Sequence, residues 1–445
     1  MAQKKKDEDR PLHELLPPVE FKAMGAASSQ EDQANLIAAR QSPAFPVTGG
    51  LIAHCLTSRG ERIMLDYTQN AVGVRYEVDG IWVNVESRDR PTGDAMLTVL
   101  KKLANLNPQE RRARQEGKFR AGFQKGELIC TLQTQGVKTG ERVLIKMASK
   151  KSKFESLEEL GMRPAMRERF KELIDAEQGF TIISAPPGGG LSTSWSFGVH
   201  AADRFVRDFV SIEDEQAPED EIINVGPIHF DTAAGQVPAD ILPRLLLKQP
   251  DVFVVPDMVD GKTVGMLCEQ VNSNQKMVIT RTNASDAVEA LFRIMALKGP
   301  TAGFAQAVTV VLNSRLMRKL CESCKQSYQP QPQLLQKLGI PPGRVSVLFR
   351  EFQPPPPEQR VDEKGRPIEI EICKDCGGTG YLGRTAVFEL LVINDQIRAA
   401  LAQQPNPDNV RRVARASGHR TLQEEGILAV AQGTTSLPEL QRALK

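Results

Sequence analysis

The chain has 445 residues, which suggests about three domains at roughly 150 residues per domain. Its formal net charge is +2 and aromatic residues make up only 5% of it, so we expect neither a basic nucleic-acid-binding surface nor an extended base-stacking platform. No apolar run approaches the roughly 18 residues of a membrane helix, and the start, MAQKKKDEDR, lacks the apolar core of a signal peptide. We therefore expect a cytoplasmic protein without a transmembrane segment.

Residues 1–45 predict a mobile N-terminal tail, because the basic run Lys4–Lys6 and several prolines surround a single short helix-like stretch at 34–39. Residues 46–150 predict a small α+β domain. Within it, apolar residues alternate over 71–79 as in a half-buried strand, and Asp79 and Gly80 then predict a tight hairpin turn. A helix with Met96, Leu100 and Leu103 on one stripe follows, and further strands are expected near 128–134 and 142–147.

A charged, non-periodic stretch at 148–155 predicts a linker, after which Ser156 and Glu159 form a capping pair that predicts a helix start. Four short, unbroken apolar runs follow and predict strands of a parallel sheet that is buried on both faces. These runs are 181–184, 209–212, 252–255 and 277–280. The sequence therefore predicts an α/β domain over 151–320.

A glycine-rich turn follows the first of these runs and precedes a helix expected over 192–204. Its sequence, APPGGGLST at 185–193, partly matches the phosphate-loop pattern G-x-x-x-x-G-K-[ST], with Ala185 at the first glycine and Leu191 at the lysine. A strand, a glycine-rich turn and a helix N-terminus are what phosphate binding requires, because backbone N–H groups then point at the anion. On its own, this pattern fits any glycine-rich turn between a strand and a helix.

Two C-x-x-C pairs, Cys321 with Cys324 and Cys373 with Cys376, are the most specific chemical signal in the sequence. The chain has seven cysteines and no export signal, which favours metal ligands over disulfides. Four thiolates complete a tetrahedral zinc site with no open position, so we predict a structural zinc module over 321–388. The alternatives are unrelated cysteines or a redox pair.

The last segment, 389–445, predicts a C-terminal helical domain with two further capping pairs.

From about Arg62 to the C-terminus, the order of these motifs resembles the type II secretion and type IV pilus assembly ATPases, the GspE/PilB family. The most distinctive stretches are SLEELGM at 156–162, SRLMRKLCESC at 314–324 and GYLGRTAVFELL at 380–391. The resemblance implies an α/β architecture: a RecA-like P-loop NTPase core (151–320) after the small α+β domain, then the zinc-knuckle module and the C-terminal helical bundle. It also implies a homo-oligomer, a hexamer or a ring mixed with an intact paralogue, that meets an inner-membrane platform protein.

Carried over to this sequence, the resemblance implies a site for ATP and Mg²⁺. Gly188, Gly189, Gly190, Ser192 and Thr193 match the phosphate loop, with Ser192 at the position whose hydroxyl binds Mg²⁺. Glu213 matches an acidic residue that polarises water or Mg²⁺, and Asp257 stands where the family has its Walker B glutamate. Asp260 matches the acid that ends that motif.

The sequence departs from the family pattern where charge matters most. Leu191 replaces the lysine of the phosphate loop, so the Walker A motif is degenerate, and Asp257 is one methylene shorter than the family's glutamate. Two family histidines become Asn274 and Arg281. In the first domain, the family has two arginines that face the nucleotide phosphates of a neighbouring subunit. Lys118 and Leu128 stand at these two positions. Losing one donor that stabilises transition-state charge costs ~10²–10³ in rate.

Two functions follow from this pattern. One is a ring or interaction subunit of a secretion or pilus machine with weak or lost ATP hydrolysis. The other is a catalytically active motor ATPase that powers pilin or pseudopilin assembly. A zinc-containing nucleic-acid-binding protein is disfavoured, because basic and aromatic residues do not interleave. His200 and His229 lack a second ligand at metal spacing and are better explained as structural histidines.

Overall fold

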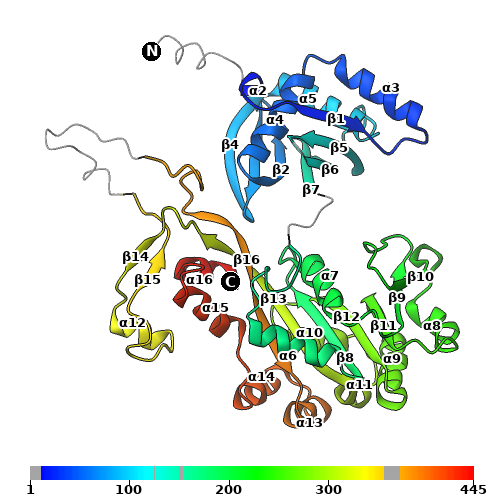
Figure 1. Ribbon diagram of the computed structural model, residues 1–445. Coiled ribbons are helices and arrows are strands. Elements are labelled where there is room, and N and C mark those ends of the chain that lie inside the picture. Colours follow the sequence, from blue (N-terminus) through cyan, green and yellow to red (C-terminus); the bar gives the residue numbers. More distant parts are fainter. Residues whose placement is uncertain (1–11, 125, 150–153, 355–370) are drawn as a thin grey trace. The chain divides into compact units, whose positions relative to one another are not determined.

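The computed structural model describes residues 12–124, 126–149, 154–354 and 371–445 and divides them into two compact units. The first unit ends at residue 149 and the second begins at residue 154 (Figure 1). Each unit is built around its own seven-stranded sheet. Within the described residues, no helix is both long enough and apolar enough to cross a lipid bilayer.

The first unit is an antiparallel sheet with the strand order β1-β5-β6-β7-β2-β3-β4. Its strands are β1 (Val19–Ala23), β2 (Gly60–Tyr67), β3 (Ala71–Val78), β4 (Ile81–Asp89), β5 (Gln115–Phe123), β6 (Gly126–Val137) and β7 (Gly140–Ser149). Its helices are α2 (Leu12–Leu15), α3 (Ser29–Arg40), α4 (Phe45–Thr57) and α5 (Arg90–Leu103). Helices and sheet share one hydrophobic core. The predicted α+β class of this unit is therefore confirmed.

The predicted hairpin is present between β3 and β4. Asp79 and Gly80 both have positive φ, 50° and 81°, as a tight two-residue turn requires. The predicted stripe of Met96, Leu100 and Leu103 is buried on α5.

The expected tail over 1–45 is wrong from Val19 onward. Strand β1 pairs with β5, and Phe21 of β1 and Ala39 of α3 are buried in the core of the first unit. A five-residue edge strand depends on its partner strand for stability, so local composition does not reveal it. The run Lys4–Lys6 lies outside the described residues.

The second unit is an α/β sheet with the strand order β10-β9-β11-β12-β8-β13-β16, parallel except for the antiparallel edge strand β16. Its strands are β8 (Gly179–Ala185), β9 (Phe209–Asp214), β10 (Val225–Phe230), β11 (Val252–Asp257), β12 (Met277–Asn283), β13 (Val308–Leu320) and β16 (Tyr381–Val392). Strands β14 (Gln326–Tyr328) and β15 (Leu348–Arg350) form a separate pair.

The helices of the second unit cover both faces of this sheet. They are α6 (Pro164–Ile174), α7 (Leu191–Ala201), α8 (Pro238–Leu246), α9 (Gly261–Asn274), α10 (Ala287–Met295), α11 (Thr301–Ala307), α12 (Pro332–Lys337), α13 (Asp395–Gln403), α14 (Pro407–Ala416), α15 (Leu422–Ala431) and α16 (Leu437–Leu444). One core includes residues of α8 to α11, α13 and α14, and another includes α6 and α7. The four predicted apolar runs are β8, β9, β11 and β12, so the prediction of a parallel sheet buried on both faces is confirmed.

Two boundaries differ from the expectation. Ser156 and Glu159 form part of their predicted capping contact, but a turn follows and the helix begins only at Pro164. Residues 321–388 and 389–445 do not form separate domains, because β16 spans the boundary between them and pairs with β13 of the main sheet. The C-terminal helices pack against the same unit.

Glu439 joins the last helix to the sheet through a buried ion pair. Its side chain is fully buried, and its oxygens accept hydrogen bonds from the backbone and guanidinium of Arg318 on β13 and from Arg442. Burial opposes ionisation of Glu439, but these hydrogen bonds outweigh it and hold the pKa of Glu439 below its ordinary value.

We expect Glu439→Gln to loosen α16 by about 2–3 kcal/mol, because it leaves buried donors without a charged partner. The change should appear as faster amide hydrogen exchange over residues 436–445, whereas the exposed Glu424→Gln should leave that segment protected. In the wild type, ionised Glu439 stabilises α16 fully above the carboxyl group's unfolded pKa of about 4.3. The protection of α16 from exchange should fall as pH drops through the lower pKa of Glu439 in the folded state. Equal exchange in both variants would contradict the assignment.

Candidate nucleotide site and cysteine cluster

The phosphate loop lies between the end of β8 at Ala185 and the start of α7 at Leu191. Gly188 and Gly190 have φ of 73° and 90°, a region that favours glycine, and the Gly189 N–H donates to the Pro186 carbonyl over 2.8 Å. Ser192 and Thr193 are exposed in the first turn of α7. The loop therefore presents a helix N-terminus and two hydroxyls to an anion.

Close packing fixes the helix that carries this loop. A Cβ added at Gly198 of α7 would lie 2.4 Å from the side chain of Ile183 on β8, so glycine lets the helix approach the sheet. Leu191 is half-buried and packs against the apolar cluster shared by α6 and α7. An apolar side chain thus occupies the place where the family resemblance implies the lysine.

The predicted acidic residues lie at the carboxyl ends of parallel strands, the edge at which open α/β sheets bind ligands. Glu213, near the end of β9, is buried and accepts a hydrogen bond from the Glu219 N–H over 3.0 Å. Asp257 ends β11, and its side chain is 49% exposed. Since β8 also ends at this edge, the sheet brings Glu213 and Asp257 to the same side as the phosphate loop.

Arg281 connects several parts of this edge. Its guanidinium donates two hydrogen bonds to Glu219, over 2.7 and 2.6 Å, and lies 3.8 Å from the Asp257 carboxylate. It also lies over the ring of Trp195 on α7, 5.4 Å from the ring centroid. The residue at a family histidine position therefore ties the loop helix to the ends of β11 and β12.

Other predicted residues have structural contacts. Asp260 caps α9, and its two oxygens accept hydrogen bonds from the N–H and hydroxyl of Thr263 over 2.8 and 2.5 Å. Asn274, also of α9, is exposed and bonds to Gln270. In the first unit, Lys118 is exposed on β5, whereas Leu128 on β6 packs against that unit's core.

Two residues of this edge were not predicted from the sequence. Trp195 is buried beneath Arg281, and Glu219 holds the guanidinium from the loop that follows β9. Trp195 carries a signal, since one of only two tryptophans in the chain follows the glycine-rich turn. Glu219 stands among several acidic residues, so only the fold distinguishes it from its neighbours.

The four predicted cysteines converge, with their Sγ atoms all within 4.8 Å of one another. The Cys321–Cys373 and Cys324–Cys376 sulfur distances are 3.8 and 3.6 Å, far from a disulfide bond of about 2.05 Å. Four thiolates about 2.3 Å from a tetrahedral zinc ion would lie about 3.8 Å apart. This donor set therefore fits a closed zinc site.

Strand pairing builds the cysteine cluster. Cys321 follows β13 directly, and its N–H donates to the carbonyl of Gly380, just before β16. The Gly380 N–H in turn donates to the sulfur of Cys376 over 3.3 Å. Within the part of the chain that the structure describes, no other group of three or more histidine, cysteine or acidic residues converges as metal ligands, so His200 and His229 belong to none.

Comparisons with known proteins show the family of this chain. A family model described as "Type II/IV secretion system protein" matches residues 38–442. The chain is 30% identical over 381 residues to the type IV pilus assembly ATPase PilB of Thermus thermophilus, covering 85% of this chain but 40% of that protein. It is 24% identical over 425 residues to the type II secretion system protein E of Xanthomonas campestris, covering 94% of this chain and 71% of that one.

Two solved structures share the fold at low sequence identity. The Legionella pneumophila ATPase DotB has a TM-score of 0.55 at 12% identity, covering 88% of this chain and 94% of that one. The pilus retraction motor PilT with bound ADP has a TM-score of 0.51 at 14% identity, covering 88% of this chain and 95% of that one. These likenesses show that the chain has the fold of these two proteins. Because the family model spans nearly the whole chain, the protein belongs to the type II/IV secretion system protein family, with relatives of the GspE/PilB type.

Proposed function

We propose that this protein is a ring or interaction subunit of a type II secretion or type IV pilus machine, with weak or lost ATP hydrolysis. The observation that carries the proposal is Leu191, an apolar side chain packed where the phosphate loop needs its lysine. Phosphoryl transfer relies on positioned charge, so losing that cation removes a main source of transition-state stabilisation.

The contacts of Arg281 support the same proposal. Its guanidinium lies near Asp257 and is bound by Glu219, so the carboxylate at the Walker B position already has a cation beside it. Asp260 has both oxygens engaged in capping α9. The loop amides and the Ser192 and Thr193 hydroxyls remain, and they favour weak binding of ATP and Mg²⁺. Bound Mg²⁺ would supply charge neutralisation at the phosphates.

The second candidate function is an active motor that powers pilin or pseudopilin assembly. It is favoured by the intact glycine geometry of the loop and by the presence of Glu213 and Asp257 at the same edge of the sheet. In that case, the arginine at position 281 would be the cation that compensates for Leu191.

Steady-state phosphate release decides between the two functions. We expect wild type to turn over at least ~10²-fold more slowly than a relative with an intact lysine, because one transition-state donor is missing. Leu191→Lys should improve nucleotide binding more than the rate of hydrolysis, since the side chain of Asp257 is still one methylene shorter than the family's glutamate. Ser196→Ala, on the same helix but beyond the loop, is the matched control. If wild type turns over at the relative's rate and Asp257→Ala abolishes it, the protein is a working motor.

We also propose that Cys321, Cys324, Cys373 and Cys376 hold one structural zinc ion per chain. Metal analysis of the purified protein should give about one equivalent, and Cys324→Ser should lower it. Cys268→Ser, which changes a buried cysteine outside the cluster, should leave the zinc content unchanged. Less than half an equivalent that four Cys→Ser changes leave unaltered would exclude the zinc site.

A ring assembly belongs to the same proposal: a hexamer of this chain, or a ring mixed with an intact paralogue, acting in the cytoplasm against an inner-membrane platform protein. Family membership is its support, so the warrant is analogy. Mass measurement in solution should show self-association that increases with nucleotide. A strict monomer at high concentration, with and without ATP and after co-expression with an intact family member, would contradict it.

A further inference from the structure

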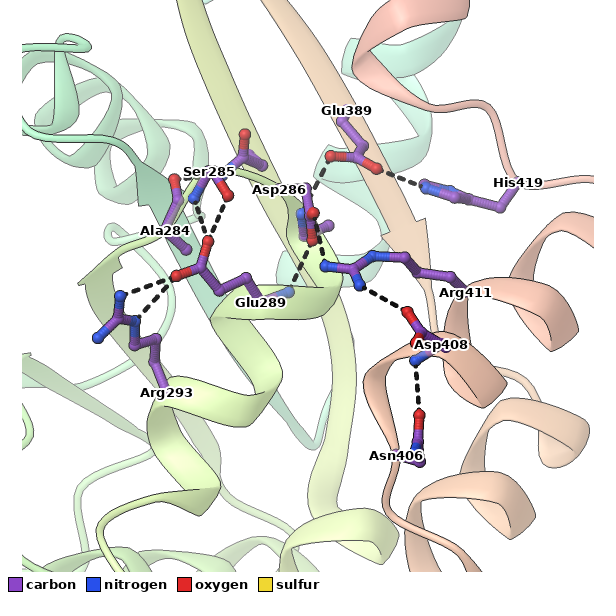
Figure 2. Close-up of polar contacts among 12 residues, drawn as sticks. Ala284, Ser285, Asp286, Glu289, Arg293, Glu389, Asn406, Asp408, Arg411 and His419 are labelled. Atoms are coloured by element: carbon purple, nitrogen blue, oxygen red, sulfur yellow. Dashed lines mark hydrogen bonds and ion pairs between the residues drawn. The ribbon is translucent and has the colours of Figure 1, made fainter. Parts of the chain in front are cut away.

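A second polar site lies in the second unit, around the first turn of α10. A cavity of about 240 Å³ is lined by residues from the start of α10, from β13 and β16, and from α14 to α16. Its charged and titratable lining consists of Asp286, Arg315, Glu389, Arg411, Arg415 and His419. Figure 2 shows Asp286, Glu389, Arg411 and His419 pointing toward one another from elements that are far apart in the sequence.

Protein donors already occupy the carboxylates of this cavity. Glu389 accepts hydrogen bonds from the Ala287 N–H over 3.0 Å and from His419 Nε2 over 2.8 Å. Asp286 caps α10 through the Glu289 N–H and pairs with Arg411 over 2.9 Å. Just outside the lining, Glu289 bonds to Ser285 and Arg293, as Figure 2 also shows.

In the part of the chain that the structure describes, two arginines of the cavity lack a carboxylate partner. Among the described residues, Arg315 and Arg415 make no ion pair, and the Nε of Arg315 is buried without a hydrogen-bond partner. Burial lowers the pKa of Arg315, and the charge of Glu289 opposes that effect. Arg315 is half-buried with an unsatisfied Nε, and the exposed Arg415 lines the same cavity, so these two arginines favour an anion there.

His419 supplies a second unsatisfied group. Its side chain is only 6% exposed, and its Nε2 is engaged with Glu389, yet its buried Nδ1 has no hydrogen-bond partner. A ligand with both donor and acceptor oxygens suits this nitrogen, because Nδ1 accepts a hydrogen bond in the neutral ring and donates one in the protonated ring. The dipole of α10 adds to the attraction for negative charge.

We propose that this cavity binds a small phosphate-bearing anion through Arg315, Arg415 and His419. Two guanidinium groups offer more paired donors than one carboxylate can accept, whereas a phosphate has enough oxygens and charge for both. The volume is below that of a site for a drug-sized ligand. Val288, Leu422 and Leu444 line the cavity beside the charges and leave apolar contacts for a short organic part.

The test must separate this cavity from the phosphate loop, because the Ala284 N–H donates to the Ala185 carbonyl where the loop begins. Calorimetric titration of the full chain with inorganic phosphate and pyrophosphate is therefore done in wild type and in Ser192→Glu, whose added charge repels anions from the loop. Binding should persist in Ser192→Glu. It should weaken by about 10- to 100-fold in Arg315→Gln and in Arg415→Gln.

Arg412→Gln is the matched control, since it removes the same charge from the same helix at an exposed residue outside the cavity lining. It should leave phosphate affinity unchanged. Arg415 is exposed, so Arg415→Gln keeps the test valid if Arg315→Gln fails to fold. Equal affinity in wild type and Arg415→Gln, or loss of all phosphate binding in Ser192→Glu, would overturn the proposal, and so would occupation of the cavity by an acidic side chain of another copy.

A second arm offers the same phosphate group as the headgroup of phosphatidic acid in phosphatidylcholine vesicles. Binding of dissolved phosphate without vesicle capture assigns a soluble ligand. Vesicle capture that is lost in Arg415→Gln and retained in Arg412→Gln assigns a lipid headgroup. Either result supports the phosphate site, and neither depends on whether the protein hydrolyses ATP.

Discussion

The phosphate loop of the second unit must hold negative charge at the N-terminus of α7 without a lysine beside it. The loop between β8 and α7 presents backbone N–H groups, a helix dipole and two hydroxyls, which together attract phosphate but supply no full positive charge. Leu191 instead contributes to the apolar packing between α6 and α7. The same residue therefore contributes to local packing and places no positive charge at the loop.

Arg281 holds a positive charge 3.8 Å from the carboxylate of Asp257, one of the two predicted catalytic residues. Its contacts with Glu219, Asp257 and Trp195 join the loop helix to two strand ends. Such a network rigidifies the edge of the sheet, because each partner fixes the position of the next. It also gives the Asp257 carboxylate a cation other than Mg²⁺.

Much of the second unit could be predicted from the sequence, since fully buried parallel strands leave unbroken apolar runs and glycines mark the turn after β8. The cysteine cluster could also be predicted, because each C-x-x-C pair is visible in the sequence. The contacts of Arg281 with Glu219 and Trp195 could not be predicted, because only the order of the strands brings these residues together. The edge strand β1 was missed for a similar reason: its hydrogen bonds are made to a strand about 100 residues away. The pairing of β13 with β16 likewise joins parts that composition alone separates.

The most direct measurement of the central claim is the equilibrium affinity for Mg·ATP in wild type and in Leu191→Lys. If backbone amides alone hold the phosphates, the added lysine should tighten binding by about 10- to 100-fold, the effect of one charge-assisted hydrogen bond. Equal and tight binding by the two proteins would contradict the account. It would mean that another cation of the site already supplies the charge that Leu191 lacks.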